Sequence, residues 1–487
     1  MITNHSYLDN PTFRGMRQSL MKTFDEIYIL DLHGNSLKRE TTPDGGTDEN
    51  VFDIRQGVAI SLFLKMGMKT KQKIYQDDLF GLRENKYQWL NINDSSKCNY
   101  PEVQPASPYY FFIQRNVDNI AKYLDWMKIN EVFPVNSVGI VTARDKLTIK
   151  WNKEEIWNTV LNFSEYDPEF AREVFQLGKD SREWKITLAQ EDIKESGLNK
   201  DNIQPILYRP FDIRYTYYTG NSRGFHCRPR NEVMGHMIKG ANLGLITVRR
   251  CPSHEQPGYF FISEFIISNG VIRSDNVSID TFFPLYLYPS YEQPDIFNQS
   301  RTCNISSKVI EKLNNNFRIN TKPNEIFAYI YSIFYSNIYR KKYAQFLQID
   351  FPRIPFVTDY QLFQEMESFG SKLIDLHLLQ SPLLEKSSVK FQGNGEDVVI
   401  GKRKYDKSTR RIYINNNYYF EGVLPEVWEY QIGGYQVMDK YIKDRKGRRM
   451  DDPRHYIHIA TAIEKTIGIQ KEIDAIYPEV EKDLIEF

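Results

Sequence analysis

Short apolar runs and one amphipathic segment alternate over the first 64 residues. The pattern predicts a strand at 2–4, a helix at 14–24 and two further strands at 27–32 and 58–64. Apolar and polar residues hardly alternate within the two later strands, which is typical of a sheet covered on both faces by helices. One helix and three strands are too few to close such a sheet, so we expect an α/β remnant whose other strands lie elsewhere.

The rest of the first 200 residues gives a mixed pattern. A polar connection at 33–54 is longer than a packing connection normally is, and we expect it to be functional or mobile. Residues 107–114 and 138–151 predict β structure. Residues 153–175 predict two short helices with a break at Pro168, because proline cannot continue a preceding helix.

The remainder of the chain predicts β structure first and helices later. Residues 208–290 contain several β-rich runs set off by glycine, proline and asparagine. A polar connector at 290–306 precedes a helical stretch at 325–350, whose apolar residues recur every three or four positions and predict a buried face. Another helix, β structure at 388–422 and a helix at 455–476 follow.

The length of the chain bears on its division into domains. A chain of 487 residues is too long for one ordinary core, and 41% apolar residues allow packed cores throughout. From the patterns we predict an α/β segment at 1–70, a β-rich region at 71–290 and a helical and mixed region at 291–487.

The charge departs from balance in one stretch. The chain carries 63 Lys and Arg against 63 Asp and Glu, yet residues 208–250 hold 8 basic and 2 acidic residues. Most of these basic residues are arginines, and six aromatic residues lie among them: Tyr208, Phe211, Tyr215, Tyr217, Tyr218 and Phe225. Arginine contacts phosphate, base edges and aromatic rings, so the mixture favours nucleic-acid binding. The alternative is a solvated edge of a β domain on which arginines cap tyrosine rings.

A second basic segment lies near the end of the chain. Residues 439–456 carry 7 Lys and Arg against 4 Asp and Glu, and Gly433 and Gly434 before them allow a tight turn or a close backbone approach. Such a segment can clamp a phosphate backbone, and a charged surface loop explains it equally well. His226 and His236, in the first basic stretch, are interpreted as structural or phosphate-contacting residues.

The sequence contains no motif of nucleotide, metal or nucleophile chemistry. GxGxxG, GxxxxGK[ST], HExxH and GxSxG are all absent, so we expect no catalytic residue and no metal site in this chain. Cys98, Cys227, Cys251 and Cys303 lie far apart, which favours reduced thiols. No signal peptide and no apolar stretch of about 20 residues is present, so we expect a cytoplasmic protein that does not enter a membrane.

Several segments resemble a known class of enzymes. One resemblance is to the part of an adenine-specific DNA methyltransferase domain that follows its catalytic motif, and it rests on ITNHSYLDNPTFRGMRQSLMKTFDEIYILDLHGN and QGVAISLFL. The other is to the C-terminal specificity region of type ISP and type IIG restriction-modification enzymes. It rests on YRPFDIRYTYY, RPRNEVM, PNEIFAYIYSIFYSNIYRKKYAQFLQIDFPRIPF and VWEYQIGGYQVMDKYIKDRKGR.

The resemblance implies the C-terminal strands of a Rossmann-like methyltransferase sheet, followed by a mixed α+β target-recognition domain with a helical C-terminal part. The family's glycine-rich turn for S-adenosylmethionine and its Asn/Asp-Pro-Pro-Tyr/Phe loop for the flipped adenine are absent. Asn10–Phe13 resembles the second motif superficially, but Thr12 replaces the second proline. We therefore expect no cofactor on this chain alone, and methyl transfer only if the missing N-terminal half is supplied. The resemblance implies that this polypeptide is the C-terminal portion of such an enzyme, separated from that half by truncation, by frameshift or by a split into two chains, with the helicase and nuclease modules upstream. A separate chain that carries the missing half is thus one possible partner.

The same resemblance implies the site residues. Thr3, Asn4 and Ser6 would line the edge of the flipped-base pocket. Basic residues of both charged stretches would contact double-stranded DNA, at base edges and phosphates. These are Arg209, Arg214, Arg223, Arg228, Arg230, Arg249, Arg250, Lys443, Arg445, Lys446, Arg448 and Arg449.

Sequence-specific DNA recognition in the service of adenine-N6 methylation and restriction is therefore the first hypothesis. A self-contained methyltransferase with divergent motifs is the second, and it predicts that this chain alone binds S-adenosylmethionine. A protein that interacts with a partner other than DNA, or a nonfunctional gene fragment, is the third. Whether this chain is itself an enzyme stays open among them.

Overall fold

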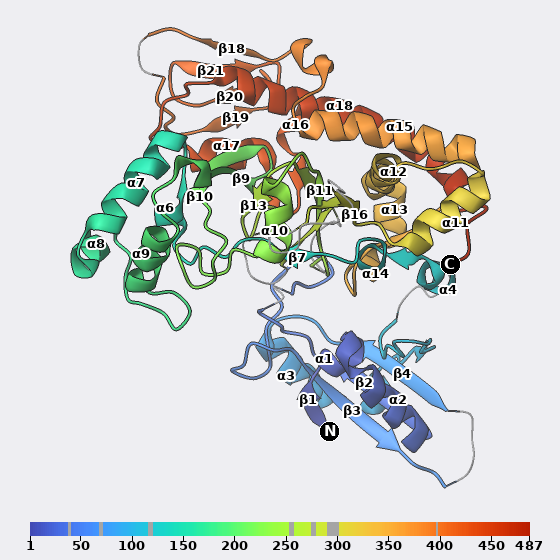
Figure 1. Cartoon of the computed structure of the whole chain (residues 1–487). Coiled ribbons are helices and arrows are strands. Elements are labelled where there is room, and N and C mark those ends of the chain that lie inside the picture. The colour runs from blue at the N-terminus through green and yellow to red at the C-terminus, as the bar shows by residue number, and fades with distance from the viewer. Residues whose placement is uncertain are drawn as a thin grey trace. The chain divides into compact units, whose positions relative to one another are not determined.

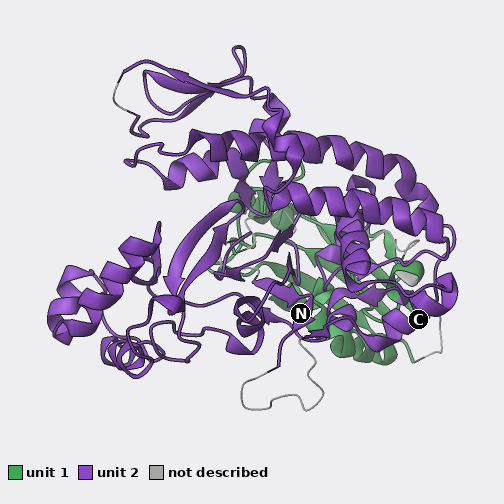
Figure 2. Ribbon diagram, turned by 45° about the horizontal axis from the view of Figure 1, so that its top comes forward, with its two compact units in different colours: residues 1–124, 252–256 green, residues 125–251, 257–487 purple. Residues whose placement is uncertain are grey.

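The structure is a computed structural model that describes residues 1–37, 40–67, 72–114, 120–252, 258–273, 279–289, 301–395 and 398–487. It divides into two compact units (Figure 2): unit 1 comprises residues 1–124 and 252–256, and unit 2 comprises residues 125–251 and 257–487. The boundary expected at residue 70 thus lies inside unit 1. The boundary expected at residue 290 falls at the edge of a segment outside the described residues.

Unit 1 is built on a mixed five-stranded sheet with the order β1-β3-β2-β4-β5. Only β2 and β4 pair in parallel, and the other neighbours pair antiparallel. The strands are β1 (Ile2–Asn4), β2 (Glu26–Asp31), β3 (Val58–Leu64), β4 (Lys73–Asp78) and β5 (Glu102–Val103). The first three match the sequence prediction closely. The fourth was not predicted, because charged residues flank a short alternating run, and its pairing with β2 extends unit 1 beyond residue 70.

The helices of unit 1 are α1 (Ser6–Asp9), α2 (Arg14–Thr23) and α3 (Arg83–Ile92), and a further short helix, α4 (Ile120–Asp125), starts at the end of the unit. Residues 107–114 form turns, with Tyr110 N donating to Ala106 O, so the strand expected there is wrong. The segment is held instead by the buried Arg17, whose guanidinium donates to the carbonyls of Tyr7 and Tyr109.

The long connection after β2 is anchored in unit 1. Lys86 on α3 is fully buried, pairs with Asp48 at 2.8 Å and donates to the carbonyls of Leu32 and Glu49. A buried ammonium keeps its charge only where such partners surround it. The contacts therefore fix the described part of the connection against the sheet.

Unit 2 contains two four-stranded sheets at the centre of the view in Figure 1. One has the order β13-β9-β10-β8, and its strands are β8 (Ile149–Lys150), β9 (Ile203–Arg209), β10 (Asp212–Tyr217) and β13 (Ile266–Ile267). The other has the order β12-β11-β14-β7, and its strands are β7 (Ser137–Val138), β11 (Gly244–Val248), β12 (Phe260–Ser263) and β14 (Asp280–Pro284). These strands confirm the β-rich pattern predicted over 208–290.

The helices of this region include α7 (Lys153–Glu165), α8 (Pro168–Val174), α9 (Ile186–Glu195) and α10 (Asn231–Ile238), besides the one-turn helices α5 (Ile129–Val132) and α6 (Asp145–Thr148). The proline break bears on α7 and α8. The predicted break between the first two is confirmed, because Asp167 caps α8 and Pro168 occupies its first position. Phe163, Trp184 and Phe225 are fully buried together in the core beneath them.

The later part of unit 2 is mainly helical, with α11 (Ser307–Phe317), α12 (Pro323–Tyr335), α13 (Asn337–Lys342), α14 (Ala344–Leu347), α15 (Tyr360–His377), α16 (Pro425–Trp428), α17 (Val437–Asp444) and α18 (Pro453–Val480). Figure 1 shows α15 running along α18, and α12 packs against α15. Every residue from Ile326 to Tyr335 is buried, and the helix ends there because the side chain of Ser336 caps α13.

Unit 2 also contains a small antiparallel sheet with the order β18-β21-β20-β19, which confirms the β structure predicted at 388–422, and several two-stranded sheets. Its strands are β18 (Lys390–Gly393), β19 (Lys404–Asp406), β20 (Arg411–Tyr413) and β21 (Tyr418–Glu421). The fold is thus mixed, with several small sheets and a helical C-terminal part. Among the helices of the described residues, none combines the length and the apolarity that a bilayer span requires.

Candidate nucleic-acid interface

The loop between β10 and α10 is organised around a buried carboxylate on α9. Asp192 accepts hydrogen bonds from Thr219 Oγ1 at 2.8 Å, Asn221 Nδ2 at 2.8 Å and Phe225 N at 2.7 Å. A side chain at Gly224 would overlap this carboxylate, so only glycine fits there. The loop is therefore held in one course by a residue about 30 positions earlier in the sequence.

The loop contributes side chains both to the core and to the solvent-facing surface. Phe225 and Cys227 are buried in the core, whereas Arg223 and Arg228 are exposed. His226 is also fully buried. Thr216 Oγ1 donates to Thr148 O, so its contact with His226 Nε2 at 2.8 Å requires that the histidine donate.

Three arginines of this loop meet at one pocket of about 340 Å³. Arg223, Arg228 and Arg230 form the arginine pocket, together with Ser222, Cys227, Glu183 and Glu232. Arg228 pairs with Glu183, whereas Arg223 makes no ion pair with any residue that the structure describes. Burial leaves Arg230 Nε without a hydrogen-bond partner within the described part of the chain. Arg223 therefore offers exposed donors to an anionic ligand, whereas the unpartnered Nε of Arg230 is itself buried beside the pocket.

Arg230 is the N-cap residue of α10. Its φ of +57° is in the left-handed region, and the helix begins at the next residue. Arg228, two positions earlier, forms a backbone bridge with Val141, which fixes the strand-like approach to this turn. Backbone hydrogen bonds to a neighbouring segment therefore hold the arginine pocket, although it lies on a loop.

A second group of arginines lies around Trp151, and it joins the two basic stretches. Asp212 pairs with Arg214 at 2.8 Å and with Arg445 at 2.6 Å. The guanidinium carbons of Arg214, Arg445 and Arg448 lie 3.7, 4.9 and 4.7 Å from the ring centre of Trp151. We call these five residues the Trp151 cluster.

Three members of the Trp151 cluster are largely withdrawn from solvent, whereas Arg448 is 43% exposed and pairs with Glu155 at 3.2 Å. The side chain of Asp212 is 2% exposed, and those of Arg214 and Arg445 are 11% and 15% exposed. Burial alone would raise the pKa of Asp212, but the charges of Arg445 and Arg214 outweigh it and hold this pKa below its usual value. Because one carboxylate engages both guanidinium groups, their donors are committed inside the protein.

The other predicted DNA-binding residues are dispersed over unit 2. Arg209 is half-buried, with its guanidinium over the rings of Tyr208 at 4.1 Å and Tyr435 at 5.2 Å. Arg249 is exposed and pairs with Asp350 at 2.9 Å. Four further residues are exposed: Arg250, Lys443, Lys446 and Arg449.

The aromatic residues of the first basic stretch serve mainly as core. Phe211, Tyr217, Tyr218 and Phe225 are buried, so four of the six are not stacking surfaces for bases. Tyr208, which is half-buried, supports Arg214 with a guanidinium-to-ring distance of 3.9 Å. The sequence could not separate these roles, because the presence of a tyrosine does not show whether it packs in a core or stacks on a base.

Unit 1 holds the residues that were expected at the edge of a base pocket. Thr3 and Asn4 lie on the edge strand β1, and Asn4 Oδ1 accepts a hydrogen bond from Ser6 N at 2.8 Å. The nearby pocket of about 230 Å³ is lined by His5 and by none of these three. Asn10 Oδ1 accepts from Thr12 N at 2.9 Å and caps a short helical turn, η1 (Pro11–Phe13).

Sequence reasoning missed the residues that organise these sites. Trp151, Asp192 and Asp212 bind or support the arginines, but they are remote from them in the sequence or carry the opposite charge. His5 and Glu40, which approach His33 in unit 1, were missed for the same reason. An Asp-x-His pair at the end of a predicted strand, Asp31 and His33, was the one available signal.

Solved structures with this fold are known. A cryo-EM structure of a DrdV–DNA complex is 20% identical with a TM-score of 0.69, covering 97% of this chain and 50% of that chain. The ATP-dependent Type ISP restriction-modification enzyme LlaBIII bound to DNA is 21% identical with a TM-score of 0.69, covering 97% and 32%. A nuclease-deletion mutant of the Type ISP enzyme LlaGI, in complex with a DNA substrate mimic, is 21% identical with a TM-score of 0.65, covering 97% and 45%. The chain therefore spans half or less of the length of these proteins.

Among curated proteins, none matches the chain. A family model described as the Type ISP C-terminal specificity domain matches residues 131–473, which lie within the range of unit 2 except for a few residues. The match confirms the resemblance that the segments at 208–218, 323–356 and 427–448 suggested. Because it covers well over half of the sequence, the chain belongs to the Type ISP C-terminal specificity domain family.

Proposed function

We propose that the chain recognises a specific sequence in double-stranded DNA, as the specificity part of a restriction-modification enzyme. The arginine pocket carries this proposal, because it offers uncommitted guanidinium donors inside the region that the specificity family matches. The names of three solved structures with this fold, all of them DNA complexes, support it further.

The two arginine groups have different roles in this proposal. Arg223, Arg228 and Arg230 contact base edges and phosphates, since a guanidinium binds guanine or phosphate with two parallel hydrogen bonds. The exposed residues contact the DNA backbone and set its register: Arg249, Arg250, Lys443, Lys446 and Arg449. Arg209, Arg214, Arg445 and Arg448 hold the two basic stretches together beside Trp151 and the neighbouring tyrosines.

We further propose that unit 1 is the C-terminal part of a Rossmann-like, adenine-specific methyltransferase domain. The resemblance of residues 2–64 and the mixed sheet with its parallel β2–β4 pair support this assignment. S-adenosylmethionine and the catalytic loop belong to the complete enzyme. The cofactor turn is absent from this sequence, so no residue of the chain is assigned to the cofactor.

The proposal is tested by selecting duplexes from a randomised library with the purified full chain. The selected duplex and a scrambled duplex of the same composition are then compared by fluorescence anisotropy at near-physiological salt. We expect a common motif among the selected duplexes, and an affinity for it on the order of 10³-fold above that for the scrambled duplex.

Two outcomes contradict the proposal at different levels. Equal affinity for selected and scrambled duplexes would remove sequence recognition and leave nonspecific binding. Absence of binding even at low salt, where phosphate contacts are strongest, would remove DNA as the ligand.

A further inference from the structure

Besides Asp9, five titratable side chains of unit 1 line one pocket and have no part in the proposed recognition of DNA. They are His5, Asp31, His33, Glu40 and Asp78, and the pocket has a volume of about 230 Å³. The parallel strands β2 and β4 end with Asp31 and Asp78 in register, so these two carboxylates lie side by side at the C-terminal ends of the two strands. The segment after β1 and the connection after β2 bring the other three side chains to the same end of the sheet.

Each histidine has one ring nitrogen held by an aspartate. His5 Nδ1 lies 3.0 and 3.2 Å from the two carboxylate oxygens of Asp31, and His33 Nε2 lies 2.8 Å from Asp78 Oδ1. Such a contact places the proton of a neutral imidazole on the nitrogen that faces the carboxylate. The lone pair of each ring is then on the other nitrogen, an arrangement typical of histidines that bind metal ions.

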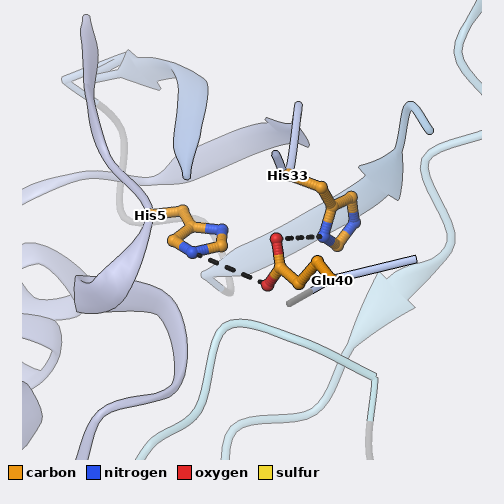
Figure 3. A group of neighbouring side chains, drawn as sticks. All are labelled: His5, His33 and Glu40. Carbon is orange, nitrogen blue, oxygen red and sulfur yellow. Dashed lines mark ion pairs between the residues drawn. The ribbon is translucent and has the colours of Figure 1, made fainter. Parts of the chain in front are cut away.

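The remaining nitrogens both face Glu40, as Figure 3 shows. His5 Nε2 lies 3.9 Å from Oε1, and His33 Nδ1 lies 4.0 Å from Oε2. One ligand atom from each of the three residues lies within 4.8 Å of the others. These separations are too long for hydrogen bonds. Ligand atoms around a tetrahedral ion with bonds of about 2.1 Å are about 3.4 Å apart, so small side-chain movements suffice to enclose one.

We infer that His5, His33 and Glu40 bind a divalent transition-metal ion of the zinc type, with Asp31 and Asp78 as the outer carboxylates that orient the two imidazoles. Two imidazole nitrogens and one carboxylate suit such an ion, whereas magnesium and calcium prefer oxygen ligands alone. Three protein ligands leave a coordination position open towards the pocket. The ion would tie the N-terminal segment to the connection after β2.

The surroundings of the three ligands fit this role. The side chains of His5, His33 and Glu40 are 4%, 15% and 17% exposed, so the site is shielded but reachable. Asn35 N donates to Glu40 Oε2 at 2.8 Å and orients the carboxylate. Asn35 Nδ2 lies 3.2 Å from His5 Nε2, and the ion would replace this contact. A side chain at Gly57 would overlap the His5 ring, so glycine permits the ring's position.

The inference is tested by titrating the metal-stripped full chain with Zn²⁺ in a calorimeter and with Co²⁺ in an absorption spectrometer. We expect one ion per chain and Co²⁺ bands typical of nitrogen and oxygen ligands. Glu40→Gln and His33→Gln remove one ligand each and should weaken binding by more than about 100-fold, whereas Asp78→Asn should weaken it about 10- to 100-fold.

A matched control is available in the same connection of unit 1. Asp44 is exposed and belongs to no group of potential ligands among the described residues, so Asp44→Asn removes the same charge and should leave binding unchanged. Melting temperatures in a chelator show that each variant is folded, and Glu40→Gln keeps the size of the side chain if His33→Gln does not fold. Absence of stoichiometric binding, equal affinity of Glu40→Gln and wild type, or a cobalt–thiolate band from a cysteine site would overturn the inference.

Discussion

The arginine pocket and the Trp151 cluster contain three arginines each, and they differ in whether a buried carboxylate holds these arginines. In the Trp151 cluster the nearly buried Asp212 engages Arg214 and Arg445, and a tryptophan ring lies beneath them. In the arginine pocket Arg223 is exposed without an ion pair among the described residues, and Arg230 retains an unpartnered donor. A local excess of basic residues therefore does not identify a ligand site by itself. What matters is whether each guanidinium group already binds a buried carboxylate of the protein.

The largest expected effect concerns the carboxylate of the Trp151 cluster. Asp212→Ala leaves two poorly exposed guanidinium groups without their partner, which costs about 3–5 kcal/mol of unfolding free energy. Urea unfolding of the variant and the wild type measures this difference. Asp451→Ala serves as the control, because this residue is 83% exposed and its pairing with Arg449 at 3.7 Å should contribute little. Equal stability of both variants would mean that the Trp151 cluster has no structural role.

The next largest effect concerns the arginine pocket itself. Replacing Arg223 and Arg230 together by Ala should weaken binding of the selected duplex by on the order of 100-fold or more, because each arginine contact is worth about 1–3 kcal/mol. The melting temperature should stay close to that of the wild type, since neither side chain has an ion pair within the described structure to lose. A double replacement of Lys308 and Lys312 by Ala, both exposed on α11, removes the same charge elsewhere and is the matched control. An equal loss of affinity in both double variants would mean that the arginine pocket contributes only nonspecific electrostatic attraction.

His226, on the buried side of the loop between β10 and α10, should make the stability of the protein depend on pH. Burial lowers the pKa of His226 to about 3, whereas an unfolded histidine titrates near 6.5. Between these values the unfolded chain binds the extra proton, so stability is complete above pH 6.5 and falls as the pH drops towards 3. This histidine should contribute up to about 2 kcal/mol to the loss between pH 6.5 and 5.

Unfolding curves at pH 7 and pH 5 measure this effect, and His226→Gln should reduce the difference between them. It should not abolish the difference, because the buried His377 also has a pKa of about 3, lowered by burial. An unchanged pH dependence in His226→Gln would contradict the structural role of this residue.

The smallest effect is expected at the exposed basic residues outside both groups. Lys443 lies on α17 and is exposed, and it should contact only the DNA backbone. Lys443→Ala should weaken binding a few-fold for selected and scrambled duplexes alike, and it should lower the slope of log affinity against log salt by about one. A loss confined to the selected duplex would assign Lys443 to sequence readout instead.

The sequence was sufficient for elements whose residues repeat with a clear period. The strands at 27–32 and 58–64 and the long helix near the C-terminus were predicted within a few residues, because their apolar patterns are set by local burial. The strand expected at 107–114 was wrong, since its aromatic run packs in turns and has no partner strand among the described residues. The strand β4 was missed because its pairing partner, β2, lies 42 residues or more earlier and leaves no local signal.

The roles of individual site residues depend on such remote contacts even more. Arg445 and Asp212 are 233 positions apart, so the sequence showed two basic stretches but not that a carboxylate joins them. His5 and Glu40 approach each other only because the sheet of unit 1 brings their segments to one of its ends. Charge counts thus located the basic stretches, and only the structure separates committed arginines from available ones.

Chemical footprinting of arginines tests the central claim most directly. Phenylglyoxal modifies accessible guanidinium groups, and mass spectrometry of the digested full chain reports the modification of each arginine with and without the selected duplex. The account predicts that DNA protects Arg223, Arg228 and Arg230, whereas Arg214 and Arg445 react little in either state. Bound DNA that leaves the three arginines of the arginine pocket fully reactive would contradict the account.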